Sequence, residues 1–101
     1  MGALAIDPGT REVWRDHEAI LLTPREFDLL RVLAEASGRV VDRQHILSGV
    51  FGPGYFGDER MLDTYVRRLR KKIEVDPEHP RYVHTVRGVG YRLAEPEAVG
   101  R

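Results

Sequence analysis

Residues 60–73 read R-M-L-D-T-Y-V-R-R-L-R-K-K-I, and this stretch decides the fold. On a helix that turns by about 100° per residue, its apolar side chains fall on one narrow stripe: Leu62, Val66, Leu69 and Ile73. The other side carries Arg60, Thr64, Arg67, Arg68 and Lys71, with Arg70 and Lys72 on the flanks. The pattern predicts a helix that packs its stripe on a core and presents cations to an elongated anion such as DNA.

The charge of the whole chain conceals this feature, because 16 Lys and Arg balance 16 Asp and Glu. The charges are nevertheless separated along the sequence. Residues 1–37 hold four basic and seven acidic side chains, whereas residues 60–73 hold six basic and one acidic. Residues 81–92 add three Arg and no acid. Such asymmetry favours a polyanionic partner more than the total charge does.

Length and composition set the remaining bounds. A chain of 101 residues, 42% of them hydrophobic, suits one globular domain over residues 1–94, followed by a flexible tail over 95–101. The lack of Cys excludes disulfides, thiol catalysis and Cys-bound zinc. No signal-peptide pattern and no apolar run of membrane-spanning length is present, so we expect a cytoplasmic protein that does not enter a membrane.

The residues before the basic helix predict short strands and then two helices. We expect strands at 3–6, 12–15 and 19–22, with a turn at residues 7–10. Thr23-Pro24-Arg25-Glu26 is a capping box, and the helix that follows would bury Phe27, Leu30, Leu33 and Ala34 and stop at Gly38. After an extended connection at 39–41, Asp42 would cap a shorter helix that buries Ile46, Leu47 and Val50 and ends in a loop over 51–57.

The residues around and after the basic helix predict its limits and a hairpin. Asp58 or Glu59 would lead into the helix, and the prolines at 77 and 80 would end it near Glu74. Residues 82–86 and 91–93 would pair around a turn at 87–90, with Arg87 at its tip. The predicted fold is therefore α+β: an N-terminal antiparallel sheet, three helices and a C-terminal β-hairpin wing, which together define a winged helix-turn-helix.

The chain closely resembles the DNA-binding effector domain of OmpR/PhoB-type response regulators. The matching stretches are L-T-P-R-E-F-D-L-L (22–30), R-V-V-D-R (39–43), D-E-R-M-L-D-T-Y-V-R-R-L-R-K-K-I (58–73) and T-V-R-G-V-G-Y-R-L (85–93). The resemblance implies a four-stranded N-terminal sheet, three helices and a hairpin wing. It also implies a two-component transcriptional regulator with a receiver domain upstream of this one.

The resemblance also implies site residues. Thr64 and Arg68 match positions that face base edges in the major groove, and Arg67 is a further candidate for such a contact. A second set matches positions that bind phosphates or flank the groove: Arg60, Tyr65, Arg67, Arg70 and Lys71. Thr85 and Arg87 match positions of the wing, which reaches the minor groove or the DNA backbone. The family often has Val and His where this chain has Thr64 and Tyr65, so the target sequence is not inherited from relatives. We expect Arg68→Ala to relax the sequence specificity of DNA binding. Arg70→Ala is expected to weaken binding to all DNA sequences by a similar factor.

Further partners follow from the resemblance. Two copies are expected to bind direct-repeat half-sites of double-stranded DNA, although the isolated domain should be monomeric. The loop over 51–59 matches a segment that touches RNA polymerase in activating members.

Asp63 is interpreted as structural, pairing with Arg67 one helical turn away.

Other functional classes are weaker. The four His show no ligand spacing and no catalytic arrangement stands out, so we expect no enzyme activity, no metal and no cofactor. One alternative is a winged-helix protein-interaction module that applies its basic face to an acidic partner. A basic amphipathic helix for anionic membranes is disfavoured, because its apolar stripe is narrow and is needed for the core.

Overall fold

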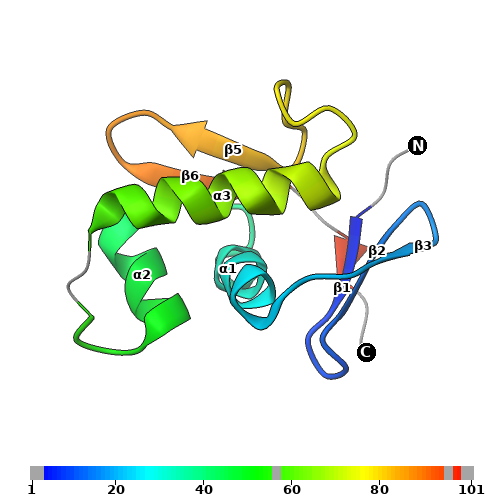
Figure 1. Ribbon diagram of the computed structural model, residues 1–101, viewed down its shortest axis with the longest axis horizontal. Helices are drawn as coiled ribbons and strands as arrows, with labels where there is room; N and C mark the ends of the chain where they lie inside the picture. The colour runs from blue at the N-terminus through cyan, green and yellow to red at the C-terminus, as the bar shows by residue number, and fades with distance from the viewer. Residues whose placement is uncertain (1–3, 56–57, 95–96, 99–101) are drawn as a thin grey trace.

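The computed structural model describes residues 4–55, 58–94 and 97–98. The elements in chain order are β1 (Leu4–Asp7), β2 (Glu12–Arg15), β3 (Glu18–Ile20), α1 (Pro24–Glu35), β4 (Val41–Asp42), α2 (Arg43–Phe51), α3 (Glu59–Ile73), β5 (Val83–Val86), β6 (Gly90–Leu93) and β7 (Glu97–Ala98). The prediction of an α+β winged helix-turn-helix is confirmed (Figure 1).

The first sheet has the strand order β3-β2-β1-β7. β1 and β2 pair antiparallel, as do β2 and β3, in agreement with the predicted N-terminal sheet. The fourth strand, Glu97–Ala98, lies within the predicted tail over 95–101 and pairs parallel with β1; the other residues of that predicted tail lie outside the described residues. β3 is also shorter than the predicted strand at 19–22 and ends at Ile20, before the exposed Leu21.

Each helix begins at the cap that the sequence predicts. The Thr23 side chain accepts a hydrogen bond from the Glu26 N–H, and the Glu26 carboxylate accepts one from the Thr23 N–H, which completes the capping box of α1. Asp42 caps α2 through the His45 N–H, and Asp58 caps α3 through the Arg60 N–H. These caps satisfy backbone donors that a helix start leaves unpaired.

The core forms around α1, which lies between the first sheet and the other two helices (Figure 1). Phe27, Leu30 and Leu33 are buried as predicted, whereas Ala34 is only half-buried. Leu29 and Val32 are buried in addition. Helical periodicity predicts one narrow buried stripe, which suits a helix that packs on a single neighbour. α1 contacts α2, α3 and β6, so a wider part of the helix surface is buried.

The wing is part of a second sheet with the order β4-β6-β5. The connection predicted at 39–41 contributes β4, which pairs with β6 at Val41–Tyr91 and Asp42–Gly90. Gly90 is required by this pairing, since a Cβ built there would lie only 2.0 Å from the Val41 carbonyl oxygen. The hairpin is thus attached to the start of α2 and does not project from the body by itself.

Candidate nucleic-acid interface

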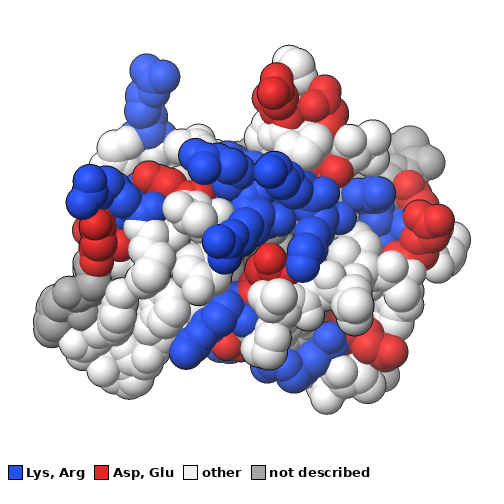
Figure 2. Space-filling view, viewed as in Figure 1, with Lys and Arg blue, Asp and Glu red and all other residues white. Residues whose placement is uncertain are grey.

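α3 separates apolar from basic side chains as the sequence predicts. Leu62, Val66, Leu69 and Ile73 are each at most 1% exposed. On the other side Arg67, Arg68 and Lys71 are exposed to solvent. Figure 2 shows Lys and Arg side chains gathered over the position of α3. The buried stripe holds the helix rigidly on the core, so the cations on its outer side point away from the molecule.

The exposed cations of α3 differ in whether they have an acidic partner. Arg67, Arg68 and Lys71 form no salt bridge with any carboxylate that the structure describes. Arg60 is exposed, but its Nη2 lies 2.8 Å from Asp58 Oδ2. Lys72 Nζ lies 2.7 Å from Glu26 Oε1, and Glu26 is almost fully buried. Three cations of the helix are therefore available to an external anion without breaking an internal ion pair.

Arg70 is directed toward the wing. Its guanidinium donates hydrogen bonds from Nε and Nη2 to the Val83 carbonyl oxygen, at 3.2 and 2.9 Å, and from Nη2 to Thr85 Oγ1 at 2.9 Å. Two of the predicted DNA-contacting residues, Arg70 and Thr85, thus contact each other. Their geometry links α3 to β5.

Glu74, just after α3, forms a second link that sequence reasoning missed. Its buried carboxylate accepts hydrogen bonds from the backbone N–H groups of Arg81, Tyr82 and Val83, at 2.7 to 3.1 Å. A carboxylate that accepts several backbone hydrogen bonds is strongly held. The sequence carried no signal for this role, because the helix end was predicted from the prolines at 77 and 80 and the backbone donors lie seven to nine residues after Glu74.

Asp63 forms the third link, and here the predicted partner was wrong. Its carboxylate accepts hydrogen bonds from Arg43 of α2 and from the Tyr91 hydroxyl of β6, the latter at 2.7 Å. Arg67, the predicted partner, contributes only an electrostatic attraction. The structural role is confirmed, but the partners come from elements distant in the sequence.

The environment of Asp63 changes the titration of this cluster. Burial opposes ionisation of Asp63, but the hydrogen bonds from Tyr91 and Arg43 outweigh it, and the pKa of the carboxyl lies below its ordinary value. Burial raises the pKa of the Tyr91 hydroxyl, and the bond to Asp63 raises it further. Asp63 is thus held as a carboxylate that joins α2, α3 and the wing.

The wing presents Arg87 to solvent at its turn, as predicted. The turn closes with a hydrogen bond from the Val89 N–H to the Val86 carbonyl, and Gly88 has φ of +78°. Between the wing and α3 lies a cleft of about 780 Å³. Its lining includes Arg67, Arg70, Lys71 and Thr85. Four of the nine predicted site residues therefore meet in one basic cleft.

Thr64 and Tyr65 lie nearer the start of α3 and are half-buried. Tyr65 packs edge-on against Phe51 at the end of α2, with ring centroids 5.8 Å apart. The guanidinium carbon of Arg68 lies 5.6 Å from the centre of the Tyr65 ring. Residues 56–57 of the loop predicted to touch RNA polymerase lie outside the described residues.

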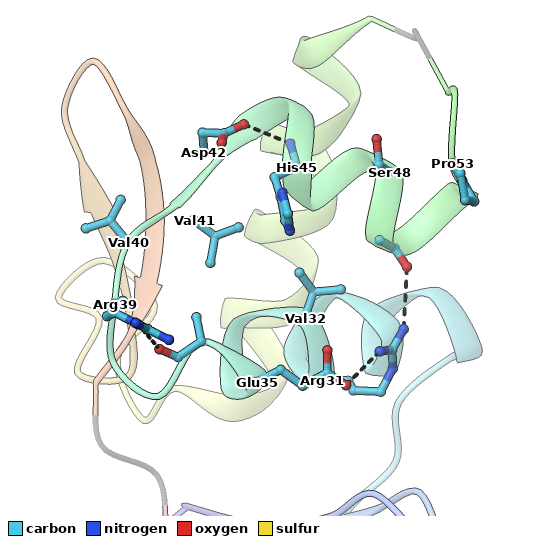
Figure 3. Close-up of a pocket in the computed structure, with 12 residues that line it drawn as sticks. Arg31, Val32, Glu35, Arg39, Val40, Val41, Asp42, His45, Ser48 and Pro53 are labelled. Atoms are coloured by element: carbon cyan, nitrogen blue, oxygen red, sulfur yellow. Dashed lines mark hydrogen bonds and ion pairs between the residues drawn. The ribbon is translucent and has the colours of Figure 1, made fainter.

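A second hollow, of about 600 Å³, lies between α1 and α2 (Figure 3). Its arginines have acceptors within the protein. Arg31 donates to Glu35 at 3.0 Å and to the Gly49 carbonyl at 3.4 Å, and Arg39 donates to the Ala36 carbonyl at 3.2 Å. Two arginines are balanced here by Glu35 and Asp42, whereas four Lys and Arg side chains line the cleft beside α3 against Asp63 and Glu78, so this hollow is less suited to a polyanion.

The described residues offer neither a metal site nor a membrane-spanning helix. These residues contain no group of three or more His, Asp or Glu side chains arranged to hold a metal ion. Within the same part of the chain, no helix combines the length and the apolar character needed to cross a lipid bilayer.

The comparison with known proteins decides the family. A family model described as "Transcriptional regulatory protein, C terminal" matches residues 16–93. The chain belongs to this family. The match covers α1 to α3 and the wing, and the predicted resemblance to OmpR/PhoB-type effector domains is confirmed.

Solved structures agree with membership of this family. The DNA-binding domain of RstA from Klebsiella pneumoniae, in complex with the RstA box, has 38% identity and a TM-score of 0.81, with 92% of each chain covered. DrrB, a Thermotoga maritima OmpR/PhoB homologue, has 38% identity and a TM-score of 0.83 over 94% of this chain. The DNA-binding domain of CpxR from E. coli has 32% identity and a TM-score of 0.76, over 92% of this chain and 91% of that one. The present chain spans only 43% of the length of DrrB.

Proposed function

We propose that this domain binds duplex DNA in a sequence-specific manner, as the output domain of a two-component transcriptional regulator. The observation that supports it most is the set of three exposed cations on α3 that pair with no carboxylate among the described residues, on a helix whose other side is fully buried. An α-helix fits the major groove of B-DNA, where base pairs are distinguishable. Of the solved relatives, RstA was crystallised with the RstA box and AdeR with an intercistronic region.

Different residues would serve affinity and specificity. Thr64 and Arg68 would face base edges in the major groove, where Arg pairs with guanine and Thr contacts a base edge or a thymine methyl. Arg60, Arg67 and Lys71 would contact phosphates, with Arg70 and Thr85 beside them in the cleft, and Arg87 of the wing would reach the minor groove or its backbone. Phosphate contacts release condensed counterions, so the affinity would fall steeply with salt.

The proposal is tested by selecting bound duplexes from random DNA and measuring binding by fluorescence anisotropy over a salt series. We expect the selected duplex to bind more tightly than a scrambled duplex of equal length at every salt concentration. Heparin and an acidic protein serve as controls, since a protein-interaction module would bind these as well as DNA. Equal affinity for selected, scrambled and control polyanions would contradict the proposal, and binding to anionic liposomes in flotation would favour the membrane alternative.

The longer protein would supply further partners. We propose a receiver domain upstream, head-to-tail binding of two copies on direct repeats, and contact of the loop over 51–59 with RNA polymerase in the manner of activating relatives. Non-enzymatic action and a cytoplasmic location belong to the same proposal.

A further inference from the structure

Tyr65 connects the aromatic end of α2 with an exposed arginine of α3. On one side its ring meets Phe51, with centroids 5.8 Å apart and ring planes at 68°, an edge-to-face arrangement. On the other side, the Arg68 guanidinium carbon lies 5.6 Å from the ring centre. Tyr65 and Arg68 are three positions apart and are therefore neighbours on the helix surface.

The aromatic partner of Tyr65 is itself anchored. Phe51 stacks on Tyr55 with ring centroids 4.8 Å apart, and the Arg25 guanidinium carbon lies 4.7 Å from the centre of the Phe51 ring. Arg25 donates to the Val50 carbonyl at 2.7 Å, and Gln44 donates to the Tyr55 carbonyl at 2.5 Å. Contacts from α1 and α2 thus hold the cluster of Phe51, Tyr55 and Tyr65 in place, and the Tyr65 ring has a defined position.

Among the described residues, Arg68 has no polar restraint comparable to these. It is exposed and forms no salt bridge with a carboxylate of the described part of the chain. A free arginine loses much side-chain entropy when a DNA base orders it. A guanidinium within about 6 Å of an aromatic ring centre is attracted by the ring, so Tyr65 restricts Arg68 before DNA arrives.

We propose that Tyr65 is a positioning residue for Arg68 and that its ring, rather than its hydroxyl, contributes to DNA recognition. The inference rests on the proposed function and deepens it. The family resemblance implies a phosphate contact for Tyr65, which would require the hydroxyl as donor. The packing favours a platform that keeps Arg68 over one base pair, in a chain that departs from the family's frequent histidine at this position.

The two roles are separated by two substitutions in the full chain. Tyr65→Phe keeps the ring and removes the hydroxyl, whereas Tyr65→Leu removes the ring. Binding is measured to the selected duplex and to the duplex changed at the base pair where Arg68→Ala loses discrimination. We expect Tyr65→Phe to keep the discrimination of the wild type and Tyr65→Leu to lose about two- to fivefold of it, the factor that an exposed cation–π contact supplies.

A double variant tests whether Tyr65 acts through Arg68. In an Arg68→Ala background, Tyr65→Leu should cause no further loss of discrimination at this base pair. The proposal is overturned if Tyr65→Phe and Tyr65→Leu weaken binding to all duplexes equally, because that result assigns the effect to a hydroxyl on a phosphate. A further loss in the Arg68→Ala background would overturn it as well.

A measurement without DNA keeps this inference distinct from the proposed function. Ring current from Tyr65 should shift the Arg68 side-chain proton resonances upfield in the wild type and in Tyr65→Phe, and the shift should vanish in Tyr65→Leu. Thermal unfolding confirms that each variant is folded. Absence of the shift in the wild type overturns the platform even if DNA binds specifically. If the shift is present but no duplex is preferred, the proposed function fails and the recognition role fails with it, although the contact itself is verified.

Discussion

At the scale of single residues, the charged side chains of α3 fall into two groups according to their partners within the protein. Arg67, Arg68 and Lys71 are exposed and form no salt bridge with a described carboxylate, whereas Arg70 and Asp63 are held by the wing. Side chains of the first group can exchange water for DNA without disturbing the fold. Arg70 and Asp63 instead fix the position of the wing relative to α3, and so they determine the shape of the surface that DNA would contact.

Arg68→Ala and Lys71→Ala should therefore change different properties of DNA binding, the first its specificity and the second its overall affinity. Loss of Arg68 should reduce discrimination against a wrong base pair by about 1–3 kcal/mol, the usual value of a bidentate base contact. Loss of Lys71 should weaken selected and scrambled duplexes alike and lower the slope of log K against log salt by about 1. Anisotropy titrations at several salt concentrations measure both quantities. If the two variants lose affinity in the same pattern, this division of roles is wrong.

Asp63 predicts a pH dependence of stability. Its pKa is lower in the folded chain than in the unfolded chain, where it is about 3.9, so the folded state favours the carboxylate. The resulting stabilisation is complete above the unfolded pKa and is lost as the pH falls below it toward the folded pKa. We expect the free energy of unfolding of the wild type to fall more steeply than that of Asp63→Asn in this acidic range, as measured by urea unfolding. Parallel curves for the two proteins would show that Asp63 makes no such contribution.

At the scale of elements, the wing is attached to the body at both of its strands. β6 pairs with β4, and β5 is held through Glu74 and Arg70 of the α3 segment. The angle between wing and helix is thus set by contacts within the domain before DNA binds.

Glu74→Gln tests the attachment of β5. The amide keeps the shape of the side chain but brings an NH₂ group toward backbone N–H donors, so buried donors lose their acceptor. Hydrogen bonds to a charged group contribute about 1.5–3 kcal/mol, and we expect a loss of stability of this order. Hydrogen exchange should accelerate at the amides of 81–83 more than in α1. Uniform acceleration over both regions would indicate global destabilisation instead.

Gly90→Ala tests the attachment of β6. The new Cβ would overlap the Val41 carbonyl oxygen, so β4 and β6 would have to separate, at a cost of about 1–3 kcal/mol or more. Gly88→Ala is the matched control, because its φ of +78° is strained but, its chain neighbours aside, no atom of the described residues lies within 4 Å of the added Cβ. Chemical unfolding should show the larger loss for Gly90→Ala. The reverse order would mean that the pairing of β4 with β6 contributes little.

At the scale of the whole molecule, α3 and the wing place basic side chains on one side of a chain whose total charge is zero, so the rest of the chain is net acidic (Figure 2). A single domain of this size reads one half-site, so two copies must lie on the same face of the DNA to contact each other. Half-sites separated by one helical turn, about 10 base pairs, satisfy that requirement.

Two direct-repeat half-sites should therefore bind two copies cooperatively only at the correct spacing. We expect insertion of about 5 base pairs, half a helical turn, to abolish cooperativity while each half-site keeps its own affinity. Mobility-shift titrations measure this, and sedimentation velocity should show a monomer without DNA. A stable DNA-free dimer, or cooperativity that survives the insertion, would exclude the tandem arrangement.

The sequence by itself determined the elements whose causes are local. Thr23, Asp42 and Asp58 cap the helices within one turn, the stripe from Leu62 to Ile73 follows helical periodicity, and Gly88 allows the turn that carries Arg87. Tertiary structure decided which cations are free, because the partners of Arg70, Lys72 and Asp63 lie on elements far away in the chain. The same holds for β4 and β7, whose two-residue strands exist only through pairing with distant strands. Local propensity acts over one turn of chain, whereas ion pairs and strand pairing depend on the folded arrangement.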